Sequence, residues 1–180
     1  MTSDEQLILE LQQGSTDAFT ELFLRYRERV YAFFRRRMSE PAQAEELAQE
    51  TFLAVLTAAQ RYEPRATFRA YLFGIAFNIL AAHRRKAASN SAHTTPLADG
   101  NLSSPNPSPE MVLGLRQAVS RLDANEREIL LLREFEELTY DEIARILRLP
   151  LNTVRSRLFR ARMSLRETLS AAAKPSGVQK

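Results

Sequence analysis

Two helical patterns with a turn between them occupy residues Leu138–Leu158, which have the sequence LTYDEIARILRLPLNTVRSRL. Thr139 is followed three residues later by Glu142, a spacing that fits a capping box at the start of the first helix. We expect Pro150 to end this helix and Asn152 to cap the second one. The stretch therefore predicts a helix-turn-helix.

The second helix of this pair has one apolar side and one cationic side. Its apolar residues recur at spacings of four, three and four, at Val154, Leu158, Ala161 and Leu165. Seven arginines and no acidic residue occur from residue 145 to residue 166. Arginine pairs with phosphates or guanine edges, and an apolar side chain can contact a thymine methyl group. A solvated helix face is the alternative interpretation, but the capped turn and the lack of acids favour DNA binding.

The remainder of the chain predicts helices and no strands. Apolar residues recur at helical spacing, and breaks at Gly14-Ser15, Pro41 and Pro64 predict helices over 4–13, 16–38, 41–60 and 66–87. Residues 88–109 are rich in Ser, Asn, Thr and Pro, which predicts a flexible linker. Helical periodicity returns over 110–173, and 174–180 form a predicted disordered tail. The expected fold is all-α, with two small helical domains, 1–87 and 110–173, joined by the linker.

Two surfaces of the N-terminal half suggest binding. A helix around residues 44–53 can turn Leu47, Thr51 and Val55 inward, which leaves an acidic outer face for a basic partner protein or for solvent. Aromatic residues within 67–78 precede the basic run 83–86. Rings that stack on bases and cations that neutralise phosphates suit single-stranded nucleic acid. Some of these rings, Phe68 and Phe73 among them, are expected in the core.

Composition excludes several classes of protein. The chain has no cysteine, so disulfides and thiolate metal sites are excluded. The first ten residues carry three acids where a leader would be basic and apolar, and no apolar stretch reaches membrane-spanning length. We therefore expect a soluble, cytoplasmic protein with no membrane insertion. The two histidines belong to no metal-spaced cluster and no glycine-rich phosphate loop is present, so no catalytic residue, metal or cofactor is expected.

Both halves of the chain, in order, resemble the extracytoplasmic-function (ECF) subfamily of the sigma-70 family of bacterial RNA polymerase sigma factors. Residues 138–166 are similar to the family's fourth conserved region, and residues 45–52 and 71–78 are similar to its second. The resemblance implies a promoter-recognition subunit that is not an enzyme. Its implied partners are RNA polymerase core, promoter DNA and an anti-sigma factor.

The resemblance also implies roles for individual residues. The helix of residues 45–52 would dock on the clamp helices of the polymerase β′ subunit through Glu45, Glu46, Gln49, Glu50 and Phe52. The following loop and helix would capture a flipped base of the minus-ten element and help to melt it, through Arg61, Tyr62, Arg65, Tyr71, Asn78, His83, Arg84 and Arg85. The second helix of the helix-turn-helix would bind the minus-thirty-five element through Thr153, Arg155, Ser156, Arg157, Phe159, Arg160 and Arg162, with Arg157 and Arg162 on phosphates.

Three positions depart from the family pattern. Tyr71 stands where the family usually has tryptophan, Phe77 where arginine is common, and Ala82 where aspartate is frequent. A tyrosine ring can still stack on a base. The main alternative for the whole chain is a stand-alone helix-turn-helix regulator that binds duplex DNA as a dimer. It is disfavoured because the N-terminal half has acidic and aromatic surface and no signature of an apolar ligand pocket.

Overall fold

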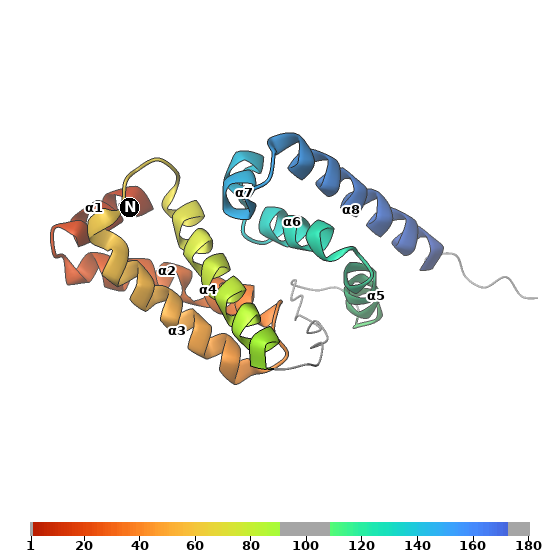
Figure 1. Cartoon of the computed structure of the whole chain (residues 1–180), viewed down its shortest axis with the longest axis horizontal. Helices are drawn as coiled ribbons and strands as arrows, with labels where there is room; N and C mark the ends of the chain where they lie inside the picture. Colours follow the sequence, from red (N-terminus) through yellow and green to blue (C-terminus); the bar gives the residue numbers. More distant parts are fainter. Residues whose placement is uncertain (1, 91–108, 173–180) are drawn as a thin grey trace, which may run out of the picture. The chain divides into compact units, whose positions relative to one another are not determined.

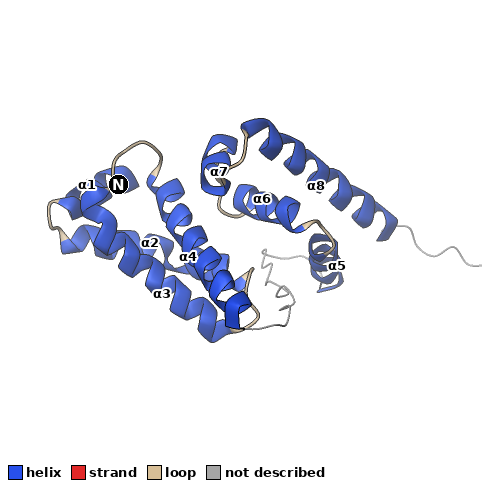
Figure 2. Cartoon of the chain, viewed as in Figure 1, coloured by secondary structure: helices blue, strands red, loops and turns tan. Residues whose placement is uncertain are grey.

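The computed structural model describes residues 2–90 and 109–172 and divides the chain into two compact units, residues 1–100 and 101–180. The described residues form α-helices and a short 3-10 turn, and no strand occurs among them (Figures 1 and 2). The all-helical prediction is confirmed. Most of the predicted linker, 91–108, and the predicted tail, 174–180, lie outside the described residues.

The helices of the N-terminal unit follow the predicted ranges closely: α1 (Asp4–Gln12), α2 (Thr16–Arg35), α3 (Pro41–Ala58), η1 (Ala59–Arg61) and α4 (Phe68–Asn90). Gly14 has a left-handed φ of 92°, and the Ser15 hydroxyl accepts a hydrogen bond from the Ala18 N–H, so α1 and α2 are separated where the sequence predicts. The predicted end of α4 is wrong. The helix continues through residues 88–90, which composition assigns to the linker, because no Pro or Gly stops it there.

Aromatic side chains form the core of this unit. Phe33, Phe34, Phe68 and Phe73 are almost fully buried, as expected for Phe68 and Phe73. The Phe33 ring centroid lies 5.0 Å from that of Phe34 and 5.7 Å from that of Phe73. Ring pairs at such distances add favourable electrostatic contact to the burial of apolar area. The cluster therefore joins α2 to α4.

Polar contacts tie α1 to its neighbours. Asp4 accepts hydrogen bonds from Arg25, at 2.7 Å, and from the Tyr26 hydroxyl. Burial of Tyr26, together with its bond to Asp4, raises the pKa of the tyrosine to about 12. The Glu5 carboxylate accepts a hydrogen bond from the Phe68 N–H at 3.2 Å. Helix α1 therefore also caps the start of α4.

The C-terminal unit contains α5 (Pro109–Ser120), α6 (Ala124–Glu134), α7 (Tyr140–Leu147) and α8 (Leu151–Ala172). Helices α5, α6 and α7 all pack against α8. The buried core of the unit includes Ile129, Leu132, Leu138, Ile143, Val154 and Leu158. Arg127 closes the end of α5, because its guanidinium donates hydrogen bonds to the carbonyl groups of Val119, Ser120 and Leu122.

Helices α7 and α8 form the predicted helix-turn-helix, and the capping box is confirmed. The Thr139 hydroxyl accepts from the Glu142 N–H at 3.3 Å, and the Glu142 carboxylate accepts from the Thr139 N–H at 2.8 Å. The expectation that Pro150 ends α7 is wrong. The helix ends at Leu147, because Arg148 adopts a left-handed backbone with φ of 54°.

The expectation for the start of α8 is also wrong. This helix begins at Leu151, and the Pro150 carbonyl accepts from the N–H groups of Thr153, at 2.9 Å, and Val154, at 3.2 Å. Asn152 therefore lies inside the first turn and does not occupy the capping position. The left-handed residue Arg148 ends α7 before Pro150, and α8 then begins one residue ahead of the predicted cap.

Substitution Thr139→Ala should lower the local stability of α7 by about 1 kcal/mol, because the Glu142 N–H loses its acceptor. Hydrogen exchange measured by mass spectrometry on the full chain should then show α7 amides exchanging about five times faster. Thr168→Ala is a control, because Thr168 donates to the Ser164 carbonyl within α8 and caps no helix start. Unchanged exchange in α7 of the Thr139 variant would contradict the assigned cap.

Candidate nucleic-acid and polymerase interfaces

Helix α8 has a buried stripe and an exposed face, as its spacing predicts. Val154, Leu158 and Ala161 are buried against the rest of the unit. Among the predicted DNA-binding residues, Thr153 and Arg157 are half-buried, and the exposed ones are Arg155, Ser156, Phe159, Arg160 and Arg162. The Phe159 side chain is 66% exposed, so its ring is accessible to a binding partner.

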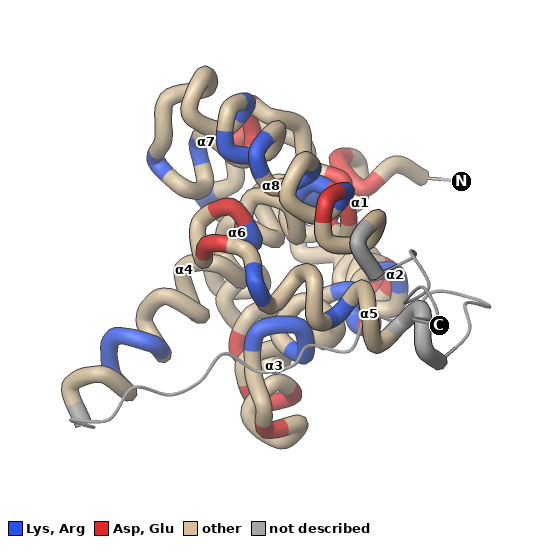
Figure 3. Tube along the Cα trace, turned by 90° about the vertical axis from the view of Figure 1, so that its right-hand side faces the viewer, with Lys and Arg blue, Asp and Glu red and all other residues tan. Residues whose placement is uncertain are grey.

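Two arginines of α8 form ion pairs with α6. The Arg160 Nε lies 2.7 Å from the Glu126 carboxylate, and a terminal nitrogen of Arg162 lies 2.6 Å from the Glu134 carboxylate. Figure 3 shows acidic residues on α6 and basic residues along α8. The sequence alone does not reveal these ion pairs, because the partners lie 34 and 28 residues away in the chain. The paired arginines are therefore less available to an anion than the sequence suggests.

Neighbouring charges and hydrogen bonds also shift pKa values around α8. The hydrogen bond from Arg162 to Glu134 raises the pKa of the arginine. The Asn125 N–H lowers the pKa of Asp123, and the charge of Arg157 lowers it further, so Arg157 lies near the start of α6. By contrast, Arg155 makes no ion pair or hydrogen bond with its side chain within residues 2–90 and 109–172. Arg155, Ser156 and Phe159 are exposed and have no ion pair with α6, and we call these three residues the recognition face.

The acidic face of α3 is exposed, and it includes apolar residues that the sequence analysis missed. Glu45, Glu46, Gln49 and Glu50 are all exposed, while Leu47, Thr51 and Val55 are buried as predicted. Leu53 and Leu56 are 63% and 44% exposed, at helical spacing from Gln49 and Glu50. Both leucines fall outside the inward stripe of α3, and this is the signal that could have revealed them. We call Glu46, Gln49, Glu50, Leu53 and Leu56 the α3 docking face.

Phe52 does not belong to this face. Its side chain is only 6% exposed, and its ring lies 4.9 Å from that of Phe23 in an edge-to-face arrangement. The position follows from the helical period, because Phe52 is four residues after Ala48 and three before Val55, and both of these residues are buried. The structure therefore places Phe52 between α2 and α3, where it supports the docking face from below.

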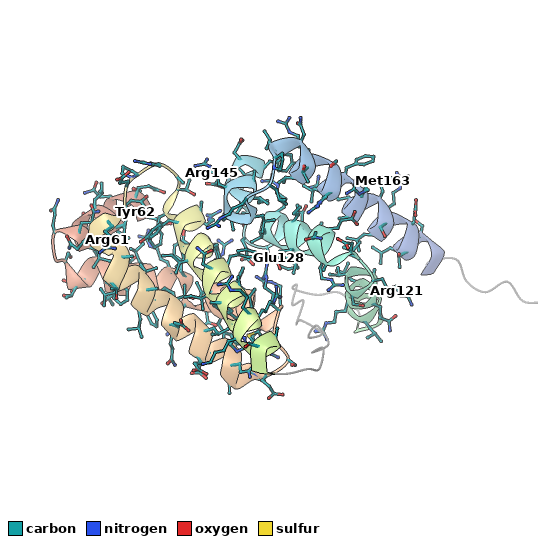
Figure 4. The ribbon with its side chains drawn as sticks, viewed as in Figure 1. Arg61, Tyr62, Arg121, Glu128, Arg145 and Met163 are labelled. Carbon is teal, nitrogen blue, oxygen red and sulfur yellow. The ribbon has the colours of Figure 1, made fainter. Side chains whose placement is uncertain are left out.

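The loop between η1 and α4 is held by a side chain of α1. Gln12 donates hydrogen bonds to the carbonyl groups of Ala59, at 2.9 Å, and Tyr62, at 2.8 Å. Figure 4 shows Arg61 and Tyr62 where the chain leaves α3 toward this loop. Arg61 and Arg65 are exposed, whereas Tyr62 is buried. The backbone of this loop is therefore fixed by contacts that lie 47 and 50 residues away in sequence.

Tyr71 lies behind the same loop. Its ring centroid is 4.9 Å from that of Tyr62, and the Tyr62 hydroxyl donates to the Ala66 carbonyl at 3.2 Å. The Tyr71 hydroxyl is buried and has no hydrogen-bond partner among the described residues. Burial raises the pKa of Tyr71, so this hydroxyl remains protonated at neutral pH. An unpartnered buried hydroxyl is costly, which makes a ligand or water at this point favourable.

The exposed side of α4 carries the remaining predicted minus-ten residues. Asn78, Arg84 and Arg85 are exposed and His83 is half-buried. Tyr71, Asn78 and Arg85 are spaced by seven residues, so they share one face of the helix. Of the positions that depart from the family pattern, Tyr71 and Phe77 are half-buried and Ala82 is exposed.

In the part of the chain that the structure describes, no group of three or more His, Asp or Glu residues could hold a metal ion. None of the described helices is long and apolar enough to cross a membrane.

Comparison with known families assigns both units. Residues 22–90 match the family model of sigma-70 region 2, and residues 113–165 match that of sigma-70 region 4. The RNA polymerase sigma-H factor of Pseudomonas aeruginosa is 31% identical in an alignment that covers 92% of this chain and 93% of the relative. The ECF RNA polymerase sigma-E factor of Salmonella typhimurium is 30% identical, with 91% and 92% covered.

Solved structures share the fold. CnrH, in complex with the cytosolic domain of CnrY, superposes with a TM-score of 0.70 at 23% identity and covers 94% of this chain and 99% of its own. The sigma factor RpoE of Bartonella quintana, in complex with the anti-sigma factor NepR, has a TM-score of 0.69 at 24% identity, with 84% and 96% covered. Two region models in the expected order and relatives matched along their length favour a sigma factor over a stand-alone regulator. The chain therefore belongs to the ECF subfamily of the sigma-70 family of RNA polymerase sigma factors, which are transcription initiation factors and not enzymes.

Proposed function

We propose that this sigma factor binds RNA polymerase core through α3, the minus-ten element through α4 and the loop before it, and the minus-thirty-five element through α8. The observation that carries the proposal is that these helices each bury one stripe and expose a face of different chemistry. The α3 face is acidic and apolar, the α4 face is aromatic and basic, and the α8 face is cationic. Two DNA-binding modules on one chain act at high effective concentration, so neither contact has to be strong alone.

The α3 docking face suits a basic helical partner, and the clamp helices of the polymerase β′ subunit are the proposed one. Leu53 and Leu56 supply apolar area at the centre of the contact, while Glu46 and Glu50 supply charge that guides association. A few exposed apolar residues surrounded by polar ones is the usual anatomy of a binding hot spot. Phe52 contributes by packing beneath the face, and we do not assign it a contact with the partner.

In the proposed minus-ten contact, buried residues hold the site rigid and exposed residues bind the DNA. Gln12 fixes the loop backbone and Tyr62 packs edge-on against Tyr71, so both support the site from inside. Arg61 and Arg65 are exposed on the loop, and Asn78 and Arg85 continue the surface along α4. A base that leaves the duplex can stack on an aromatic ring while the cations neutralise its phosphates, which offsets the free energy of melting.

The minus-thirty-five contact is proposed to use α8 in the major groove. The recognition face of Arg155, Ser156 and Phe159 is free to approach base edges, and Thr153 stands at the start of the same helix. Arg160 is assigned to a base edge, and Arg157 and Arg162 are assigned to phosphates. Base contacts give sequence preference, and phosphate contacts give orientation on the duplex.

Run-off transcription tests the whole proposal. Purified polymerase core alone should yield no transcript from a promoter of this sigma factor, and addition of the protein should yield discrete transcripts. A library of genomic fragments can serve as template, because it contains the promoter whatever the sequence of that promoter is. Tight duplex binding by the isolated protein, without any transcription that depends on core, would contradict the proposal.

Substitution Leu53→Lys should weaken binding to polymerase core by about tenfold or more, because it removes apolar area from a hot spot and adds a charge there. Binding can be measured by fluorescence anisotropy of labelled protein with purified core and no DNA. Leu169→Lys, at a leucine 37% exposed in α8, is the matched control and should bind core normally. An equal loss in both variants would contradict the assigned docking face.

We also infer that an anti-sigma protein controls this chain, an inference that rests on its family. A tagged full-length chain, recovered from its native cells, should bring down polymerase subunits and one further protein. That protein, purified and added back, should abolish run-off transcription and should compete with core for the chain. Recovery of polymerase alone, or of a protein with no effect on transcription, would overturn this inference.

A further inference from the structure

The two ion pairs between α8 and α6 engage different edges of the guanidinium groups. Glu126 binds Arg160 at Nε, and no described residue binds the two terminal nitrogens of this arginine. Glu134 instead binds a terminal nitrogen of Arg162. The pair of terminal nitrogens is the fork that bonds a guanine edge in bidentate fashion. Arg160 is therefore restrained with its fork open, whereas the fork of Arg162 is partly occupied.

Glu126 is well placed to act as a fixed support. Its side chain is 17% exposed, against 57% for Arg160, so the carboxylate belongs to the packed surface and the arginine extends from it. Its backbone N–H donates to the Asp123 side chain, which caps α6. Glu126 stands in the first turn of α6, where the helix dipole favours a negative charge. The backbone of Glu126 is thus fixed by its own helix, and its side chain is less exposed than the arginine that it binds.

We propose that Glu126 is a positioning residue for Arg160, which it restrains before DNA is bound so that the terminal nitrogens meet a base edge. The inference rests on the proposed binding of α8 to the minus-thirty-five element. An unrestrained arginine has many rotamers and can reach neighbouring phosphates, which carry no sequence information. A restrained one loses less entropy when it binds a base and reaches fewer phosphates. Glu126 therefore contributes to discrimination between sequences and not to affinity in general.

A simple charge effect is the competing explanation. A carboxylate near DNA repels phosphates, so its removal would strengthen binding to every sequence by the same factor. The two explanations differ for Glu126→Ala and Glu126→Gln. Both substitutions remove the charge, but glutamine keeps an oxygen that can accept the bond from Arg160 Nε. Glu167→Ala, at an exposed residue of the same helix as Arg160, is the control for loss of one negative charge near α8.

The test uses holoenzyme assembled from core and the full-length chain. The probe is a pool of duplexes randomised over the upstream element, from which the wild-type holoenzyme first selects its preferred sequence. Discrimination is then the ratio of affinities for that sequence and for each single base-pair change. Arg160→Ala should reduce discrimination at one base pair by about five- to 150-fold, the range expected for loss of a bidentate contact.

Glu126→Ala should reduce discrimination at that same base pair by about two- to fivefold, in line with a partly exposed ion pair. Glu126→Gln should retain most of it, and Glu126→Ala should have no further effect on discrimination in the Arg160→Ala background. Equal changes on all sequences, alike in both Glu126 variants and in Glu167→Ala, would overturn the positioning role and leave the proposed function intact. Unaltered discrimination in Arg160→Ala would instead overturn the proposed role of Arg160, and the inference with it.

Discussion

Burial of Val154, Leu158 and Ala161 fixes the rotation of α8 about its own axis, and the proposed assignment of the DNA-binding side chains of α8 depends on this rotation. A helix that buries one stripe has no freedom to choose which residues it exposes. The capping box at Thr139 and the left-handed backbone at Arg148 then set the direction in which α8 leaves α7. A small unit with a modest core thereby holds a long, mostly exposed helix in a defined orientation.

In the N-terminal unit, part of the proposed DNA-binding site is a loop, and its backbone has to be held in one conformation. Loops adopt a single conformation only when their backbone groups find partners. Here Gln12 and Glu5 of α1 provide those partners, one for the loop carbonyls and one for the first N–H of α4. Helix α1 lies outside the matched region-2 segment, residues 22–90, yet it stabilises the part of the unit on which melting would depend.

Helical periodicity predicted most of the fold, because each helix has apolar residues at regular spacing and recognisable stops. It failed for the end of α7 and the start of α8, which were predicted from Pro150 and Asn152. The left-handed backbone of Arg148 ends α7 earlier, and nothing in the composition indicates that conformation. It also failed for contacts between distant residues. The glutamates that hold Arg160 and Arg162, and the glutamine that holds the loop, can be found only once the helices are packed. Phe52 was assigned to a surface by resemblance, and packing against Phe23 places it beneath that surface.

The exposed leucines of α3 also bear on how much of this protein a cell can keep in unbound form. Leu53 and Leu56, together with Phe159 on α8, leave apolar area in contact with water until another macromolecule covers it. Exposed apolar area promotes self-association and attracts chaperones and proteases. We therefore expect the chain without its binding partners to be prone to aggregation or degradation. We expect its abundance to follow the supply of its binding partners, because protein made in excess of them would keep these residues exposed.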